Sequence, residues 1–181
     1  MKLTPTPILF AALLAASSAQ AAPPVVEFDG GYGSQPFASV GGAVAPNDVR
    51  GVPPGGRPWE IRRLKATVFN ERGLARIVVK GEGLILGGGN ATGTPGAPRE
   101  IAASLFCGSN TPFNSASVLT NAAGDFEIRS PLTDPAGNMI LPDPCGAAGA
   151  PPILLIRNAP NGVPGAWFAY GVPKVREGGD D

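Results

Sequence analysis

The chain has 181 residues, with 14 lysines and arginines balanced by 14 aspartates and glutamates, and it contains no histidine. The formal net charge of zero excludes the basic surface that binding to nucleic acid or anionic lipid requires. The absence of histidine excludes Ser-His-Asp and Cys-His catalysis and the ordinary zinc sites, so we expect no cofactor.

Residues 1–21 have the pattern of an export signal. Lys2 precedes an apolar stretch at 8–16, and small residues end the segment at Ala19-Gln20-Ala21. This order predicts cleavage before Ala22 and a secreted or periplasmic protein. The apolar stretch is shorter than the roughly 20 residues that a membrane span needs, and we expect no span in the mature form.

The remaining chain divides by composition into three parts. Residues 22–46 form an N-terminal extension with weak strand patterns, residues 47–175 a single β-domain, and residues 176–181 a polar tail. The 26 glycines and 21 prolines occur in a chain that is 43% hydrophobic. This composition favours many short strands separated by turns over disorder. The weaker strand candidates are 25–28, 37–40 and 49–52.

The clearest local pattern is a hairpin. Apolar and polar residues alternate over 64–69 and again over 75–80, which is typical of strands with one buried face. Between them, Asn70-Glu71-Arg72-Gly73 predicts a short loop closed by a positive φ at Gly73. Glycines at 81 and 83 indicate a bulge or a bend before the strand continues through 84–86.

Further strands follow in the second half of the chain. Residues 87–98 predict a surface loop, and 99–107 a strand whose residues Ile101, Ala103, Leu105 and Cys107 share one face. Residues 115–120 and 125–130 predict a second hairpin around 121–124. Two more strands are predicted, a doubly covered one at 153–156 and a closing one at 166–170. The resulting fold class is all-β, an antiparallel β-sandwich or barrel of about eight short strands.

Cys107 and Cys145 are the only cysteines of the chain. In an oxidising compartment, two cysteines in a small domain pair, so we expect a disulfide that closes a long loop. The alternative is a redox or catalytic thiol. It is disfavoured because the chain has no C-x-x-C motif and no histidine to activate a thiolate.

Several short motifs occur in an order that resembles a group of small secreted bacterial proteins. They are Gly55-Gly56-Arg57-Pro58-Trp59, a strand ending in Cys107, Gly124-Asp125, Pro144-Cys145 and Gly165-Ala166-Trp167-Phe168-Ala169. The resemblance spans residues 49–171 and implies an exported β-domain with a Cys107–Cys145 bridge. It implies no catalytic residue.

Three kinds of candidate site can be named. Trp59 and Trp167 are candidates for stacking on a sugar ring or an apolar partner, with burial in the core as the alternative. Asp134, Asn138 and Asp143 are a weak candidate for calcium, with a role in turns as the alternative. A carboxylate pair for hydrolysis would come from the following residues: Glu60, Glu71, Glu82, Glu100, Asp125 and Glu127.

The sequence therefore favours a secreted, non-enzymatic β-module that binds a protein or a cell-envelope glycan. Two alternatives stay open. One is a carboxylate-based hydrolase, and the other is a structural envelope protein whose strand edges self-associate.

Overall fold

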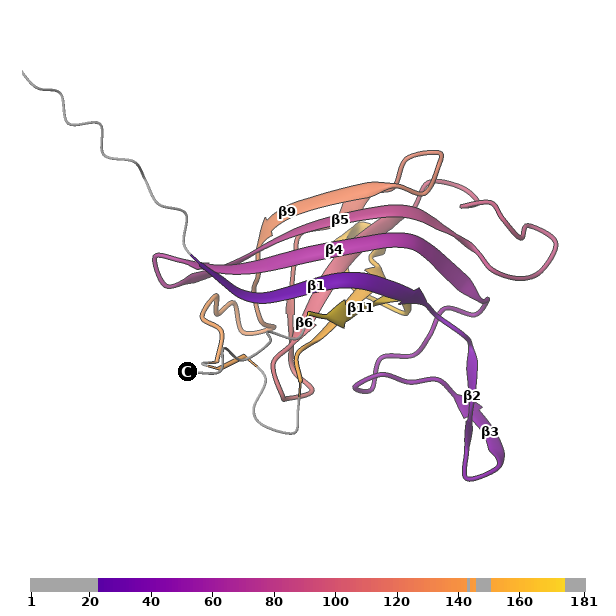
Figure 1. The fold of residues 1–181 in the computed structure, drawn as a ribbon, viewed down its shortest axis with the longest axis horizontal. Coiled ribbons are helices and arrows are strands. Elements are labelled where there is room, and N and C mark those ends of the chain that lie inside the picture. The colour runs from indigo at the N-terminus through magenta and orange to yellow at the C-terminus, as the bar shows by residue number, and fades with distance from the viewer. Residues whose placement is uncertain (1–22, 143, 146–150, 175–181) are drawn as a thin grey trace, which may run out of the picture.

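The structure is a computed structural model that describes residues 23–142, 144–145 and 151–174. It is almost entirely β, as the sequence predicts (Figure 1). The predicted leader and the polar tail lie outside the described residues. The strands are β1 (Pro24–Gly33), β2 (Phe37–Val40), β3 (Ala43–Pro46), β4 (Trp59–Glu71), β5 (Leu74–Leu86), β6 (Glu100–Phe106), β7 (Pro112–Asn114), β8 (Val118–Leu119), β9 (Phe126–Pro131), β10 (Ile153–Asn158) and β11 (Trp167–Pro173), and a 3₁₀ turn spans Pro160–Gly162.

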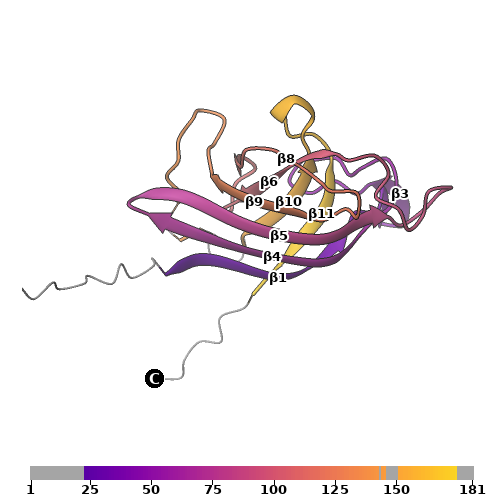
Figure 2. The same cartoon turned by 90° about the horizontal axis from the view of Figure 1, so that it is seen from above.

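One antiparallel sheet contains most of these strands, in the order β7-β6-β10-β11-β1-β4-β5-β9, with β8 also paired to β6. The sheet curls into a half-barrel, so that β1, β4 and β5 lie on one side and β6 and β8 on the other (Figure 2). Its two edges meet where the backbones of Asn114 and Thr133 exchange hydrogen bonds of 2.7 and 3.0 Å.

The predicted central hairpin is confirmed, and it is longer than the sequence pattern indicates. β4 and β5 pair in one unbroken register from Trp59 opposite Leu86 to Glu71 opposite Leu74. Arg72 and Gly73 form a two-residue turn, both with positive φ, which suits the twist of a tight hairpin. We call this tip of the half-barrel the Arg72 end and the opposite one the Trp59 end.

The glycines of β5 make close contacts possible and do not form a bulge, since the register between β5 and β4 does not shift. A Cβ on Gly81 would lie 2.1 Å from the ring of Phe126 in β9, so the ring occupies the space that a side chain would need. Gly83 has a φ of 64°, and its N–H donates to the carboxylate of Asp125 at 2.8 Å.

β6, β10 and β11 confirm three further predictions, and β11 is the closing strand predicted at 166–170. Ile101, Ala103, Leu105 and Cys107 all lie in the main core. β10 is buried on both faces, because it pairs with β6 and β11 and contributes to two separate apolar clusters. The second cluster lies on the outer face of the sheet and consists of Val52, Phe106, Leu155 and Trp167, with three half-buried neighbours.

The second predicted hairpin is wrong. The turn at Asn121–Gly124 forms, with the Gly124 N–H donating to the Asn121 carbonyl at 3.0 Å. However, β8 pairs with β6 and β9 pairs with β5, so the turn joins the two edges of the sheet. A local turn signal cannot reveal that its flanking strands have partners elsewhere in the chain.

The N-terminal strands have two different environments. β1 lies inside the sheet between β11 and β4, although the sequence pattern places it in an extension. β2 and β3 form a separate hairpin that projects from the Trp59 end (Figure 1). The candidate strand at 49–52 is reduced to a single bridge between Val49 and Val52.

The predicted disulfide is present. Cys107 and Cys145 are joined across 38 residues of chain, with their Cα atoms 4.6 Å apart. Cys145 lines a surface hollow together with Asn70 and Gly73, so the bridge lies at the Arg72 end. The closed loop contains β7, β8 and β9, the strands that form the seam of the half-barrel.

Candidate functional site

The Trp59 end is where three segments of the chain converge. The Ser34 N–H, just after β1, donates to the Phe168 carbonyl at 2.8 Å, and the Trp59 N–H donates to the Ser34 carbonyl at the same distance. Gly33 permits this approach, because a Cβ there would lie 1.7 Å from the Trp59 carbonyl oxygen. The backbone therefore fixes the start of β4 against β11.

Trp59 and Phe168 form a stacked aromatic pair at this end. Their ring centroids are 4.3 Å apart with an interplanar angle of 29°. Gly55 packs over both rings, since a Cβ there would lie 2.8 Å from the indole nitrogen and 2.9 Å from the Phe168 ring. The pair is thus a rigid part of the core whose edge reaches the end of the half-barrel.

Arg99 lies over this aromatic pair. Its guanidinium carbon is 5.1 Å from the Trp59 ring centroid and 5.9 Å from that of Phe168, which is cation–π geometry. The backbone of Arg99 is held by Thr120, which receives the Arg99 N–H on its hydroxyl and donates its own N–H to the Arg99 carbonyl. The Nε of Arg99 is buried and has no hydrogen-bond partner.

Two cavities that share lining residues open at this end, and the first of them is lined by Arg99. The first has a volume of about 420 Å³. Its lining residues are Gly56, Arg57, Trp59, Leu86, Arg99 and Phe168. The second, of about 440 Å³, shares Gly56 and Arg57 with the first and is bounded by residues 88–91 of the long surface loop. We call the two together the Trp59-end cavity.

Of the two candidate tryptophans, only Trp59 belongs to this site, and neither is exposed. Trp59 is 3% and Trp167 is 4% accessible. Trp167 packs in the outer cluster, and its indole N–H donates to the Asn47 carbonyl at 3.1 Å. Phe168 faces the opposite side of β11, as the alternation predicts, and it is buried too. Both tryptophans therefore follow the alternative of burial in the core, and Trp167 is covered on the outer face by Asn47 and Val52.

The weak calcium candidate is a turn. Asp134 accepts the backbone N–H groups of Ala136 and Asn138 on one oxygen and the side-chain amide of Asn138 on the other. These bonds, led by that of the Asn138 side chain, lower the pKa of Asp134. Asp143 lies outside the described residues. Within the described part of the chain, no three His, Cys, Asp or Glu side chains cluster to hold a metal.

Three candidate carboxylates line another hollow, of about 500 Å³, on the outer side of β5 and β9. Glu82 lies within ion-pair distance of Arg62 and Arg63, and Glu127 contacts Arg129 at 2.6 Å. Asp125 accepts from Gly83 and Asn121. Each of these three carboxylates therefore already has a partner, either an arginine or the hydrogen-bond donors of a turn and a neighbouring strand.

From the sequence, Arg57 and Phe168 appear only as members of short motifs, and Arg99 is not a candidate site residue. Arg57 lies two residues before Trp59 in the chain, but Arg99 follows the long loop and reaches the aromatic pair only through the pairing of β6. A cation that packs on a buried aromatic ring leaves no regular spacing of residues in the sequence, so a single sequence does not reveal it.

Comparison of the chain with protein-family profiles, curated proteins and solved structures finds no match. Among the described residues, no helix is long and apolar enough to cross a membrane. The disulfide fits a compartment outside the cytoplasm, where thiols are not kept reduced. By fold and bridge, the protein is a disulfide-closed, all-β half-barrel.

Proposed function

We propose that this protein is an exported, non-catalytic binding module that holds its partner at the Trp59 end. The observation that carries the proposal is the Trp59-end cavity, whose first part is lined by the side chains of Trp59, Phe168, Arg57 and Arg99. Binding sites of this size and mixed character commonly lie where loops gather at one end of a β scaffold.

A non-catalytic role is supported by what surrounds the cavity. The first cavity is lined by two arginines, two aromatic residues, a leucine and a glycine, none of which is a nucleophile or a carboxylate. The carboxylates of the other hollow are already engaged in ion pairs and turns. A hydrolase would need two of them free to act as acid and base across a cleft.

The role of the cavity can be tested by filling it. Gly56 lines both parts of the cavity, and a Cβ placed there meets no atom within 4 Å. Gly56→Phe should therefore fold normally and occupy the binding space. We expect wild-type protein to bind ligands on a glycan and peptide array, and the variant to lose them at unchanged melting temperature.

Gly56→Ala is the matched control for that experiment, because it makes the same backbone change and adds almost no volume. It should keep the binding of the wild type. Array ligands that bind Gly56→Phe as strongly as wild type would show that the partner docks elsewhere.

The exported state is supported by the leader pattern at 1–21, the disulfide and the likeness to small secreted bacterial proteins. Mass spectrometry of protein recovered from the periplasm or medium of a bacterial host should give a chain that starts at Ala22. An uncleaved chain retained in the cytoplasm would contradict export.

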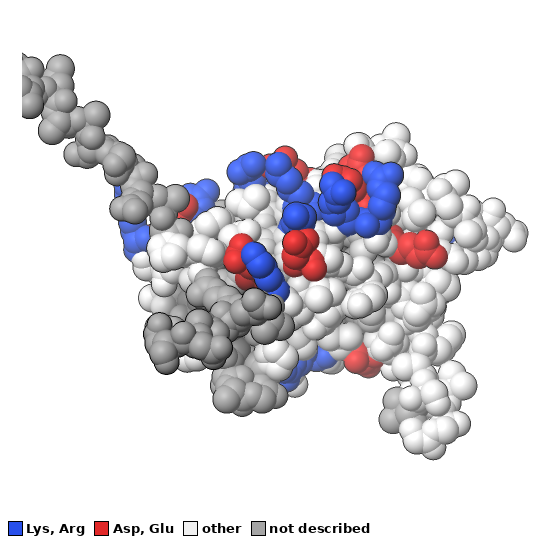
Figure 3. All heavy atoms as spheres, in the orientation of Figure 1, with Lys and Arg blue, Asp and Glu red and all other residues white. Residues whose placement is uncertain are grey.

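A second candidate function, self-association, is favoured by the β2–β3 hairpin. The segment 37–46 carries no charged residue, and Phe37 and Val44 are 66% and 79% exposed. The hairpin projects from the body as an uncharged knob (Figure 3). Unpaired strand edges without charges are templates for pairing with another chain. Light scattering that shows concentration-dependent oligomers, abolished by Val44→Lys, would establish this role; a monomer at all concentrations would exclude it.

A further inference from the structure

We propose that the Trp59-end cavity binds a carboxylate of its ligand through Arg99 and Arg57, and that the ligand is an organic acid about the size of a sugar ring. This inference rests on the proposed function and specifies the chemistry of the same site.

The first step is the distribution of charge over the surface. Blue and red side chains alternate along the long strands in Figure 3. Six cations there lie within 4 Å of a carboxylate, although exposed pairs of this kind contribute little to stability. They are Arg62, Arg63, Lys65, Arg76, Arg129 and Lys174.

Arg57 and Arg99 differ from those six cations. Neither arginine has an ion pair within the described part of the chain. Glu60, whose side chain lies against Gly87, pairs with neither of them. Other cations of the described residues also lack an ion pair, namely Arg50, Arg72, Lys80 and Arg157. Of all these unpaired cations, only Arg57 and Arg99 line a cavity together with an aromatic pair.

The second step is the hydrogen bonding of half-buried arginines. Burial lowers the pKa of Arg157, but its guanidinium donates to the carbonyls of Gly165 and Pro164 at 2.7 and 2.8 Å. Arg99 is also half-buried, and no acceptor for its guanidinium exists among the described residues. Leaving the buried Nε without an acceptor is costly, since that donor loses water without replacement.

The third step is access to those donors. Trp59 and Phe168 cover one face of the guanidinium, and its Nε is sealed from solvent. The two terminal nitrogens are not sealed, because Nε is the only Arg99 atom that is both buried and without a partner. Contact with the two aromatic rings holds the guanidinium beside the first cavity, where its terminal nitrogens are available to donate hydrogen bonds.

The fourth step is the choice of ligand. A planar guanidinium edge matches a planar carboxylate in two parallel hydrogen bonds. Arg57 borders both parts of the cavity and adds a second cation. The volumes of about 420 and 440 Å³ exceed what a bare ion needs and suit a ring that carries the acid. Glucuronate has these properties, and glucose is its neutral counterpart.

The test is a nuclear magnetic resonance titration of the exported protein with glucuronate, glucose or inorganic sulfate. The indole N–H signal of Trp59 reports on the cavity. The Trp167 indole, bonded to Asn47, is an internal reference. We expect glucuronate to shift the Trp59 signal saturably and leave Trp167 unmoved. Glucose should give no shift, and sulfate should bind at least tenfold more weakly.

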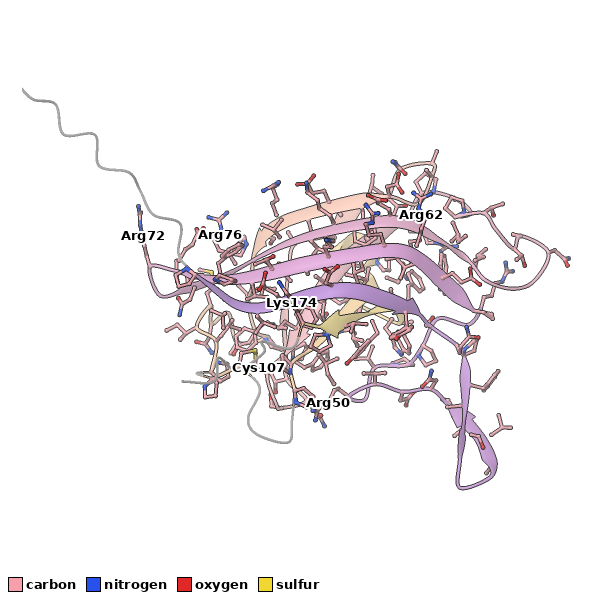
Figure 4. The ribbon with its side chains drawn as sticks, viewed as in Figure 1. Arg50, Arg62, Arg72, Arg76, Cys107 and Lys174 are labelled. Carbon is pink, nitrogen blue, oxygen red and sulfur yellow. A yellow bond between two sulfur atoms is a disulfide. The ribbon has the colours of Figure 1, made fainter. Side chains whose placement is uncertain are left out.

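Three variants separate the two arginines from general charge. Arg99→Gln should weaken glucuronate binding at least tenfold and Arg57→Gln about threefold. Arg72→Gln removes an equally unpaired cation from the opposite tip, labelled in Figure 4, and should leave binding unchanged. Should Arg99→Gln fail to fold, Arg99→Lys keeps the charge over the aromatic rings and loses the planar edge, so it should fold and still bind at least fivefold more weakly.

The outcomes that overturn the inference are distinct. Equal shifts with glucose would mean that the acid is not recognised, and sulfate binding as tight as glucuronate would remove the preference for a carboxylate. Arg72→Gln weakening binding as much as Arg99→Gln, or no shift with any probe, would also overturn it. If Gly56→Phe abolishes array binding while Arg99→Gln preserves it, this inference fails and the proposed function stands.

Discussion

The hydroxyl of Ser130 in β9 accepts a hydrogen bond of 2.9 Å from the backbone N–H of Ala116, which lies between β7 and β8 on the opposite edge of the sheet. Ser130 is 4% accessible and Ala116 is exposed, so this part-buried bond crosses the seam of the half-barrel from the interior to the surface. Together with the Asn114–Thr133 backbone bonds, it ties the two edges of the sheet to each other.

Ser130→Ala should lower the free energy of unfolding by about 0.5–1.5 kcal/mol, because it removes the hydrogen bond that the Ala116 N–H donates across the seam. Urea denaturation measures the change. Ser109→Ala removes an exposed hydroxyl with only long contacts to Thr111, and it should change stability by less than about 0.5 kcal/mol. Equal losses in the two variants would show that the seam bond does not contribute.

Gly81→Ala should be destabilising by about 1–3 kcal/mol, because the new methyl group overlaps the ring of Phe126. A double-mutant cycle checks the cause. Gly81→Ala combined with Phe126→Leu should be less destabilising than the sum of the single changes, since the smaller side chain vacates part of the space. Simple additivity would mean that the cost of Gly81→Ala has another origin.

The native protein should show no thiol to an alkylating reagent until it is reduced, because both cysteines are bonded. Reduction should lower the free energy of unfolding by about 4 kcal/mol, the chain-entropy value for a loop of this length. Replacing both cysteines by serine should give a similar loss and abolish the effect of the reductant. Two reactive thiols in the native protein would refute the bridge.

The pKa of Asp134 should lie below its ordinary value in the folded protein, and Asn138→Ala should raise it, since the Asn138 amide is the leading cause of the shift. A carboxyl whose pKa falls on folding contributes stability above its unfolded pKa, and this contribution disappears as the pH falls through the folded pKa. Carbon-13 nuclear magnetic resonance titration of the Asp134 carboxyl measures its pKa in the wild type and in Asn138→Ala. An unchanged pKa in Asn138→Ala would assign the shift to other groups.

Local patterns of the sequence were sufficient to predict the structure where paired strands are neighbours in the chain or where a single strand shows its own buried face. The β4–β5 hairpin and the inward face of β6 follow from alternation and turn chemistry, and the double burial of β10 follows from its unbroken apolar run at 153–156. The bridge between Cys107 and Cys145 follows from their number and the expected compartment. These features need no knowledge of long-range pairing.

The remaining features depend on contacts between distant segments. The Asn121–Gly124 turn has hairpin chemistry, yet β8 and β9 pair with β6 and β5. Trp167 is covered by the segment around Val52, and Arg99 reaches Trp59 only after β6 takes its place beside β10. A single sequence shows residue types and spacing along the chain, and these contacts are set by the closure of the sheet.

β1 and β11, the first and last strands of the described chain, are hydrogen-bonded neighbours, and the Lys174 N–H donates to the Glu27 carbonyl at 2.8 Å. The chain could therefore be connected in a different order while the same strands still pair with each other. A circular permutant that joins the end of β11 to the start of β1 by a short linker and opens within 87–98 would retain every rung of the sheet. Such a permutant would free the loop beside the cavity and leave the walls of the half-barrel intact.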